Sequence, residues 1–317
     1  MKFSDGTEDL SEFAPRSSAV TIGVFDGVHL GHRKVISSLI KARDEGGLSA
    51  AVLVTFDRHP LSVTAPEKAP PLLTTLEEKK SILREFDLDL VVIDRFTADY
   101  AELGYRRFIR DKLVGRFNMS HLVVGYDFRF GRDREGSLDM IRTEGRNNSF
   151  RVTVVPPAYV GGKIVSSTRI REHLLEGDIR MASERLTHDY FFDALVIEGE
   201  CIGRKIQFPT ANLLIKDRSK LIPFPGVYAV TAEVGAARYG GMMNIGTAPT
   251  VKNTPEGEIE VHIFDFSGDL YGRTVRIYCR KYLREEKKFA GKEELKQQLC
   301  RDAENARGVL ARGGYKY

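Results

Sequence analysis

The sequence predicts a doubly wound α/β domain followed by an antiparallel β-barrel domain with a C-terminal helix. The first half of the chain alternates apolar runs with segments of helical periodicity, and the second half is dominated by strand patterns punctuated by Gly and Pro. The chain has 317 residues, about twice the roughly 150 residues of a common domain. We place the domain boundary near residue 183, which gives domains of residues 1–182 and 183–317.

The alternation in the first half predicts a parallel sheet with helices on both faces. The expected strands are 19–25, 48–56, 88–96, 121–128 and 150–155, and the expected helices are 32–45, 75–86, 105–117 and one beginning near Ser167. Thr75 and Glu78 have the spacing of a capping box, and Gly46-Gly47 ends the first helix. Sheets of this kind bind ligands at the carboxyl ends of their strands.

The second half predicts a closed antiparallel barrel. After a short helical stretch at 181–186, the expected strands are 191–200, 211–215, 227–234, 238–245, 259–266 and 275–283. A last helix, 292–311, carries Leu295, Leu299, Ala303, Ala306 and Leu310 at helical spacing.

Composition excludes several classes of protein. The net charge is +4 with interspersed charges and no long basic block, which argues against a nucleic-acid partner. The 3 cysteines lie far apart, which argues against disulfides and a zinc cluster and favours a reducing compartment. No signal peptide and no apolar run of membrane-spanning length is recognisable. We expect a cytoplasmic monomer or weak homo-oligomer without a membrane partner.

The segment 21–32 joins the first strand to the first helix and carries two histidines. His29 and His32 are three residues apart, so both point to one side of the first helical turn, where unpaired N–H groups favour anions. Gly31 between them allows a phosphate to approach the backbone closely. This cradle suits nucleotidyl transfer; two structural histidines beside a turn are the alternative. The other residues expected to contact ATP here are Gly23, Phe25 and Asp26.

Hydroxyl groups and a guanidinium mark the helix beginning near residue 167. Ser167 and Thr168 stand where capping is expected, and Arg171 follows three residues after Thr168. Such a group also binds a leaving pyrophosphate well. Pure helix capping is the competing interpretation.

Aromatic residues and a carboxylate follow the strand 121–128. Asp127 is placed to accept a ribose hydroxyl, and Phe128 to flank a flat ring system. An aromatic sheet edge without a ligand is the alternative.

The segment 199–213 is the most informative part of the second half. Gly199 and Gly203 precede the basic pair Arg204 and Lys205, a pattern that predicts a loop closing over phosphates. Thr210 and Asn212 are two apart in an extended stretch and face the same way, and their neutral oxygens suit Mg2+ bound together with substrate phosphates. Turns also use Thr and Asn often.

Glu260 is the candidate base of the second half. Strand alternation places Glu260 and His262 on the face opposite Val261. Phosphorylating an alcohol requires removal of its proton, a task for a positioned carboxylate. A solvent-facing strand glutamate is the alternative.

The first half of the chain resembles the bacterial bifunctional riboflavin kinase/FAD synthetase family. The resemblance rests on the order and spacing of three motifs: His29-x-Gly-His32, Ser-Ser-Thr-x-x-Arg and Gly-x-Asp-Phe-x-Phe-Gly. The second half resembles the riboflavin kinase module through Gly-Arg-x-x-x-Phe-Pro-Thr-Ala-Asn-Leu, Pro-Gly-Val-Tyr-Ala, Asn-Ile-Gly-Thr and Glu-Val-His. The resemblance implies a Rossmann-like FMN adenylyltransferase domain and a riboflavin kinase barrel. It implies ATP, riboflavin, FMN and FAD as substrates or products, with Mg2+.

The resemblance also implies roles for individual residues. It implies that His29, His32 and Arg171 act in adenylyl transfer, that Phe56 joins the flavin pocket, and that Glu260 is the kinase base. Three more residues are implied to bind ATP or flavin in the barrel, namely Tyr228, Asn244 and Arg284.

The sequence departs from the family pattern at three positions: Arg58 stands where the family often has Pro, Gln207 where Gly is common, and Ala248 where a larger residue is frequent. If Gln207 and Ala248 disable the barrel site, only FAD synthesis remains. A flavin-binding sensor without turnover and a nucleic-acid binder using the barrel are further alternatives.

Overall fold

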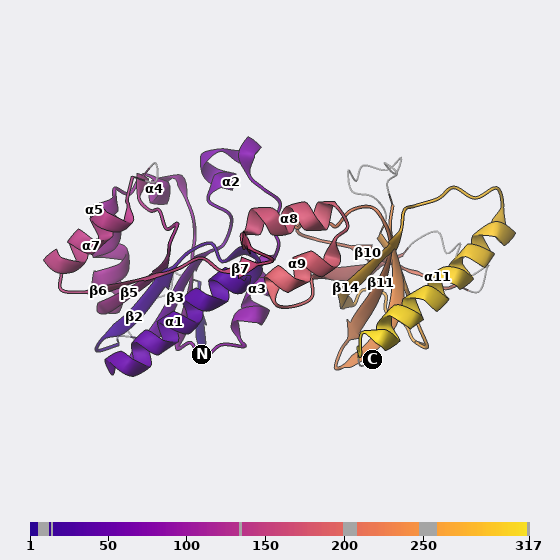
Figure 1. Ribbon diagram of the computed structural model, residues 1–317, viewed down its shortest axis with the longest axis horizontal. Helices are drawn as coiled ribbons and strands as arrows, with labels where there is room; N and C mark the ends of the chain where they lie inside the picture. Colours follow the sequence, from indigo (N-terminus) through magenta and orange to yellow (C-terminus); the bar gives the residue numbers. More distant parts are fainter. Residues whose placement is uncertain (6–12, 14, 133–134, 199–207, 247–258, 316–317) are drawn as a thin grey trace. The chain divides into compact units, whose positions relative to one another are not determined.

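The computed structural model describes residues 1–5, 13, 15–132, 135–198, 208–246 and 259–315. The chain forms two compact units, Met1–Ser167 and Thr168–Tyr317 (Figure 1).

The N-terminal unit is built on a six-stranded parallel sheet of order β1-β4-β3-β2-β5-β6. Its strands are β1 (Lys2–Ser4), β2 (Ser18–Ile22), β3 (Ala50–Phe56), β4 (Leu90–Asp94), β5 (Met119–Gly125) and β6 (Arg151–Val155). Every residue of β2, β3 and β4 is buried, as expected for strands covered on both faces. The doubly wound fold predicted from the sequence is confirmed.

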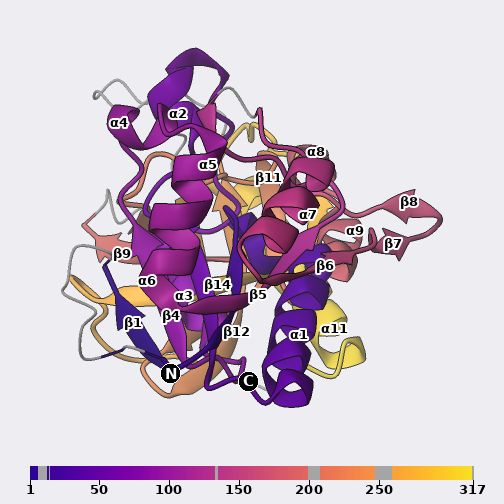
Figure 2. The same cartoon turned by 90° about the vertical axis from the view of Figure 1, so that its left-hand side faces the viewer.

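Helices cover both faces of this sheet. They are α1 (Leu30–Gly46), α2 (Leu61–Thr64), α3 (Leu76–Leu83), α4 (Ala98–Ala101), α5 (Tyr105–Arg107), α6 (Gly115–Phe117) and α7 (Leu138–Asn147), with short 3-10 turns at Asp26–Val28 and Pro66–Lys68. Figure 2 shows α1 and α6 on opposite sides of the strands. Phe108, Leu113 and Phe117 pack on the even-numbered side chains of the strands, such as Val20 and Val52, in one core cluster.

The second unit is a closed barrel of order β10-β13-β12-β11-β14-β9, and all its pairings are antiparallel. Its elements are α8 (Ser167–Leu175, beginning at the boundary), α9 (Ile179–Leu186), β9 (Phe191–Ile197), β10 (Ala211–Leu214), β11 (Gly226–Val234), β12 (Ala237–Ile245), β13 (Ile259–Ile263), β14 (Thr274–Arg284) and α11 (Lys292–Arg312). In Figure 1, α11 lies along the barrel, and its Ala306 and Leu310 pack on Ala229 and Met242. The predicted barrel and last helix are confirmed.

The predicted elements differ from the structure at their boundaries. The strands predicted to reach residues 25 and 128 end at Ile22 and Gly125, because the residues that follow form turns. The predicted helix 105–117 contains a wide π-helical segment, Phe108–Val114, between α5 and α6. The capping box of Thr75 and Glu78 is present as expected.

Two short strands, β7 (Tyr159–Val160) and β8 (Lys163–Ile164), form a separate antiparallel hairpin. Within the described part of the chain, no helix is long and apolar enough to span a membrane.

Candidate active sites

The turn after β2 has an unusual backbone. Phe25 (φ 50°), Gly27 (φ 78°) and Val28 (φ 39°) all lie in the left-handed region. That conformation is costly for a β-branched residue such as Val28, which is completely buried. Strain of this kind persists only where surrounding contacts enforce it, so the turn marks a site where geometry matters.

Asp26 uses its carboxylate to hold this turn in place. Its two oxygens accept the backbone N–H groups of Leu73 and Thr74 at 3.1 and 3.0 Å. The Thr74 hydroxyl in turn accepts the N–H of Gly27 at 3.0 Å. Asp26 is only 4% exposed, and both of its oxygens are occupied by the segment before α3. The role of Asp26 seen here is to fix the loop backbone.

The two histidines predicted to act together are in contact. Their rings stack with centroids 3.6 Å apart and planes inclined by 12°. His29 is the N-cap of α1, and its Nδ1 accepts the backbone N–H of His32. A neutral His29 therefore carries its proton on Nε2, which makes Nε2 a hydrogen-bond donor.

His32 lies in a positive and enclosed environment. Burial, with His29 and Lys79 nearby, holds the pKa of His32 well below its usual value of 6.5. Its Nδ1 is buried, and no hydrogen-bond partner for it exists among the described residues. The rings of Phe25 and His32 meet edge to face, with centroids 5.2 Å apart. His32 is therefore a neutral imidazole at physiological pH.

Gly31 and Gly23 stand where a side chain would disturb this arrangement. A Cβ on Gly31 would lie 3.1 Å from Cε1 of the His29 ring, and one on Gly23 would lie 3.2 Å from the Phe25 ring. Both contacts are tighter than ordinary van der Waals distances. The two glycines therefore leave room for the rings of His29 and Phe25.

The helix predicted to begin near residue 167 is α8, which begins at Ser167. The Ser167 hydroxyl, at the end of the N-terminal unit, donates to the carbonyl oxygen of Asp26 in the β2–α1 turn at 3.1 Å. Thr168 and Arg171 lie in the first turns of α8; Thr168 is exposed and Arg171 is buried.

The predicted flavin residue Phe56 belongs to a larger aromatic cluster at the carboxyl ends of the strands. Phe56, the last residue of β3, contacts Phe96 and Tyr100 edge to face at 5.2 and 5.6 Å. On the other side of Phe108, Phe130 stacks on Phe128 at 5.3 Å. Asp127 beside Phe128 is exposed.

Sequence reasoning missed Phe96 and Tyr100 in this cluster. The available signal was the position of Phe96, two residues after the end of β4, at the sheet edge where ligands bind.

The histidine pair and Phe128 follow the two strands between which the strand order of the sheet reverses. The chain runs from β2 to β3 and β4 on one side, and then returns to β5 on the other side of β2. Doubly wound sheets bind their ligands at this point, outside the carboxyl ends of the strands. The histidine pair follows β2, and Phe128 follows β5.

In the barrel, the register of three strands brings the predicted kinase residues into one row. Asn212 of β10 lies directly opposite Glu260 of β13, and Glu260 lies directly opposite Asn244 of β12. Directly opposed residues have Cβ atoms about 5 Å apart on the same face. Thr210 precedes Asn212 by two residues, just before β10 begins. All four side chains are partly exposed.

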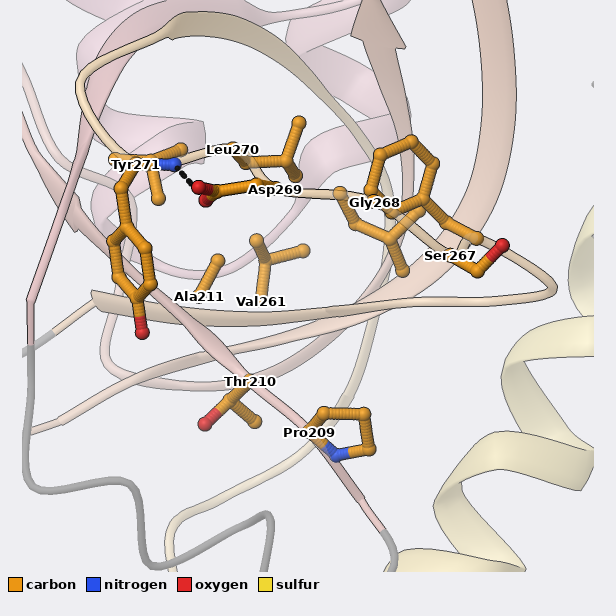
Figure 3. Close-up of a pocket in the computed structure, with 12 residues that line it drawn as sticks. Pro209, Thr210, Ala211, Val261, Ser267, Gly268, Asp269, Leu270 and Tyr271 are labelled. Atoms are coloured by element: carbon orange, nitrogen blue, oxygen red, sulfur yellow. Dashed lines mark hydrogen bonds between the residues drawn. The ribbon is translucent and has the colours of Figure 1, made fainter.

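A cavity of about 590 Å³ adjoins this row. Figure 3 shows Ala211 and Val261 pointing toward the 267–271 loop, whereas Thr210 points away from that loop. The lining includes Thr210 and Tyr271 but neither Asn212 nor Glu260, because these two lie on the other face of their strands. The cavity is a mainly apolar space next to the predicted phosphate-handling residues.

Tyr228 and Arg284 occupy structural positions. Tyr228 is fully buried, its hydroxyl donates to the Phe224 carbonyl, and its ring meets Tyr282 at 5.3 Å. Burial raises the pKa of Tyr228. The Arg284 guanidinium binds both carboxylate oxygens of Asp302 in α11, at 2.6 and 3.0 Å. In this structure Arg284 therefore anchors the C-terminal helix to β14.

The predicted loop residues Gly199, Gly203, Arg204 and Lys205 lie outside the described residues, as do Gln207 and Ala248. Within the described ranges, no group of three His, Cys, Asp or Glu side chains is arranged to hold a metal ion.

Known families match both units. A family model for FAD synthetase matches residues 12–169, and one for riboflavin kinase matches residues 186–310. The bifunctional riboflavin kinase/FMN adenylyltransferase of Escherichia coli K12 is 38% identical over 308 residues, which cover 97% of each chain. The protein of the same name from Bacillus subtilis 168 is 37% identical and covers 91% of each chain.

A crystal structure from Streptococcus pneumoniae, described as a macrolide-efflux protein, is 30% identical with a TM-score of 0.83. The match covers 96% of this chain and 98% of that one. Both family models match this chain, and the Escherichia coli protein is 38% identical to it over nearly its whole length. This chain therefore belongs to the bifunctional riboflavin kinase/FMN adenylyltransferase family.

Proposed function

We propose that this chain converts riboflavin to FMN in its barrel and then joins AMP to FMN in its N-terminal domain, making FAD. The observation that carries the proposal is that two separate segments of one chain match the family models for FAD synthetase and riboflavin kinase. The two segments leave residues 170–185 between them, and the functional boundary that we propose near residue 183 falls there.

In the N-terminal domain, an oxygen of the FMN phosphate attacks the α-phosphorus of ATP. The bond from that phosphorus to the bridging oxygen of the β-phosphate breaks, and pyrophosphate leaves. The nucleophile is already ionised, so the domain needs donors toward the developing charge rather than a strong base. The Nε2–H of His29, the helix N-terminus of α1, and Thr168 and Arg171 of α8 are the groups to which we assign this task.

We assign the flavin ring to the aromatic side of the same domain. Phe56 and Phe128 supply aromatic rings near the ends of β3 and β5, and Asp127 has the exposed carboxylate needed to accept a ribityl or ribose hydroxyl.

In the barrel, we assign Glu260 as the base. Its carboxylate takes the proton of the terminal ribityl hydroxyl while that oxygen attacks the γ-phosphorus of ATP, and ADP leaves as the bond to the bridging oxygen breaks. The opposed position of Asn212 places the carboxylate beside the residues assigned to the phosphates. The apolar cavity next to Thr210 has space for the flat ring of a nucleotide base or a flavin.

The residues of the barrel fit Mg2+ supplied with the nucleotide. Thr210 and Asn212 offer neutral oxygens, and the described residues contain no ready cluster of charged ligands. Magnesium commonly takes one or two protein oxygens and completes its shell with phosphates and water. When bound there, it would neutralise charge on the transferred phosphoryl group. The cytoplasmic location, the Mg2+ requirement and the oligomeric state all remain predictions.

Incubation of the purified chain with riboflavin and Mg-ATP, followed by product separation, tests the proposal. We expect FMN and ADP to appear first, and FAD with pyrophosphate to follow. FAD formed only from added FMN would reject the kinase half, and accumulation of FMN without pyrophosphate would reject the adenylyltransferase half. Flavin binding without turnover would reject both.

A further inference from the structure

Lys79 of α3 places its ammonium group in the interior of the N-terminal domain. Its Nζ donates to the carbonyl oxygens of Val24 and Phe56 and to the hydroxyl oxygen of Thr55, each at 3.1 Å. Only 6% of the residue is exposed. The three acceptors use all three donors of a lysine ammonium.

Holding a cation in this position is costly, since burial of a charge without a partner charge is unfavourable. The three acceptors are neutral, and within the described residues Lys79 forms no ion pair. Burial lowers the pKa of Lys79 to about 8, while Asp26 and Asp57 oppose that shift. The group therefore keeps most of its charge at neutral pH, and an apolar side chain in its place could not donate to the oxygens of Val24, Thr55 and Phe56.

The three acceptors lie at two functional parts of the domain. Val24 precedes Phe25, whose ring contacts His32, and so belongs to the phosphate-binding turn. Thr55 and Phe56 end β3, and the Phe56 ring belongs to the aromatic cluster. A single ammonium group thus joins the ends of β2 and β3 at the edge of the sheet where both substrates are expected to meet.

The chain just before Lys79 holds the same turn from a second direction. The N–H groups of Leu73 and Thr74 bind the Asp26 carboxylate, and the Thr74 hydroxyl binds the N–H of Gly27. The segment 73–79 thus contacts Val24, Asp26 and Gly27, which surround Phe25 with its positive φ.

We propose that Lys79 is a positioning residue for adenylyl transfer, which sets the distance between the His29–His32 pair and the flavin-side ring of Phe56. It touches neither substrate in this scheme and acts through the backbone of Val24 and Phe56. This inference rests on the function proposed above for the N-terminal domain.

Lys79→Met tests the inference because it removes the ammonium and keeps a long side chain. We expect kcat for FAD formation from FMN to fall about 100-fold, the loss that a displacement of about 1 Å in a reacting group can cause. The KM values for ATP and FMN should change far less, and FMN formation by the barrel should stay at the wild-type rate. The matched control is Lys80→Met, because the neighbouring Lys80 forms an ion pair with the exposed Glu77.

Nuclear magnetic resonance of His32 supplies a readout independent of turnover. Since Lys79 helps to hold the pKa of His32 down, we expect that pKa to rise in Lys79→Met. An unchanged His32 pKa together with wild-type kcat would overturn the inference. Wild-type protein that makes no FAD would instead reject the proposed function itself.

A second variant covers the case in which Lys79→Met does not fold. Thr55→Val removes one of the three acceptors and leaves the buried cation and the side-chain shape in place. We expect a fall in kcat for FAD formation of about tenfold, the equivalent of about 1.4 kcal/mol, with KM values close to those of the wild type. Wild-type kcat in a folded Thr55→Val protein would count against a positioning role for Lys79.

Discussion

Asn212 of β10 lies directly opposite Glu260 of β13, although the two residues are 48 positions apart in the chain. Barrel closure fixes this relationship, because β10 pairs with β13 on one side and with β9 on the other. The same row continues to Asn244 on β12. A carboxylate and two amides therefore lie in one row across three neighbouring strands.

Glu260→Gln tests the assignment of the kinase base. The amide preserves the shape of the side chain but cannot accept the hydroxyl proton, so we expect FMN formation to fall between about 100-fold and 10,000-fold. FAD formation from added FMN should be unaffected. Glu233→Gln is the matched control, since Glu233 also lies on a barrel strand but pairs with Arg238. Full kinase activity in Glu260→Gln would remove this residue from the mechanism.

His29→Ala should separate the two activities in the opposite direction. Loss of one donor to the developing charge typically raises the barrier by about 3 kcal/mol, so we expect FAD formation to fall at least 100-fold while FMN formation persists. Steady-state assays with FMN or riboflavin as substrate measure the two rates. His121→Ala is the control, because His121 bonds to Thr153 between β5 and β6 and has no assigned role. Equal loss of both activities in His29→Ala would contradict the assignment.

Much of this arrangement was accessible from sequence because it depends on local patterns. The contact of His29 with His32 follows from helical spacing, whereas the common face of Thr210 and Asn212 stays a prediction, because Thr210 lies just before β10. The opposition of Asn212 and Glu260 did not follow, because strand register is a property of the closed barrel. No local pattern in the sequence marks Lys79 as buried, and only tertiary packing shows that it is.

Arg284 has a structural contact that the resemblance did not imply. The motif around it suggested a residue on the flavin side of the barrel, and nothing in the local sequence indicated a partner. That partner, Asp302, lies on α11, and its distance along the chain concealed the pair.

The stability of the N-terminal domain should decrease as the pH falls below about 7. The folded state holds the pKa of His32 below 6.5, so the unfolded chain binds a proton first as the pH drops. One such group gives a slope approaching about 1.4 kcal/mol per pH unit, which ends at the pKa of the folded state. Urea unfolding at a series of pH values measures the slope.

His32→Gln should flatten this pH dependence. It should not abolish it, because burial and Arg151 also lower the pKa of His121. An unchanged slope in His32→Gln would show that His32 titrates normally in the folded protein.

The pair of Arg284 and Asp302 should stabilise the barrel and support kinase activity together. Asp302 is 2% exposed and also accepts a hydrogen bond from Gln298 at 2.9 Å, so removing either partner leaves a buried charge uncompensated. We expect Arg284→Met and Asp302→Asn each to lower the free energy of unfolding by about 3 kcal/mol. The double variant should lose clearly less than the sum, because the two residues interact directly.

The exposed pair of Arg307 and Asp265 is the control for this cycle, and its disruption should cost at most about 1 kcal/mol. Kinase assays distinguish anchoring from direct flavin contact by Arg284. If Arg284 acts by holding α11 on β14, Asp302→Asn reduces FMN formation as much as Arg284→Met does. If Arg284→Met alone loses activity while both variants are equally stable, the guanidinium must act on the flavin itself, and the anchoring account is wrong.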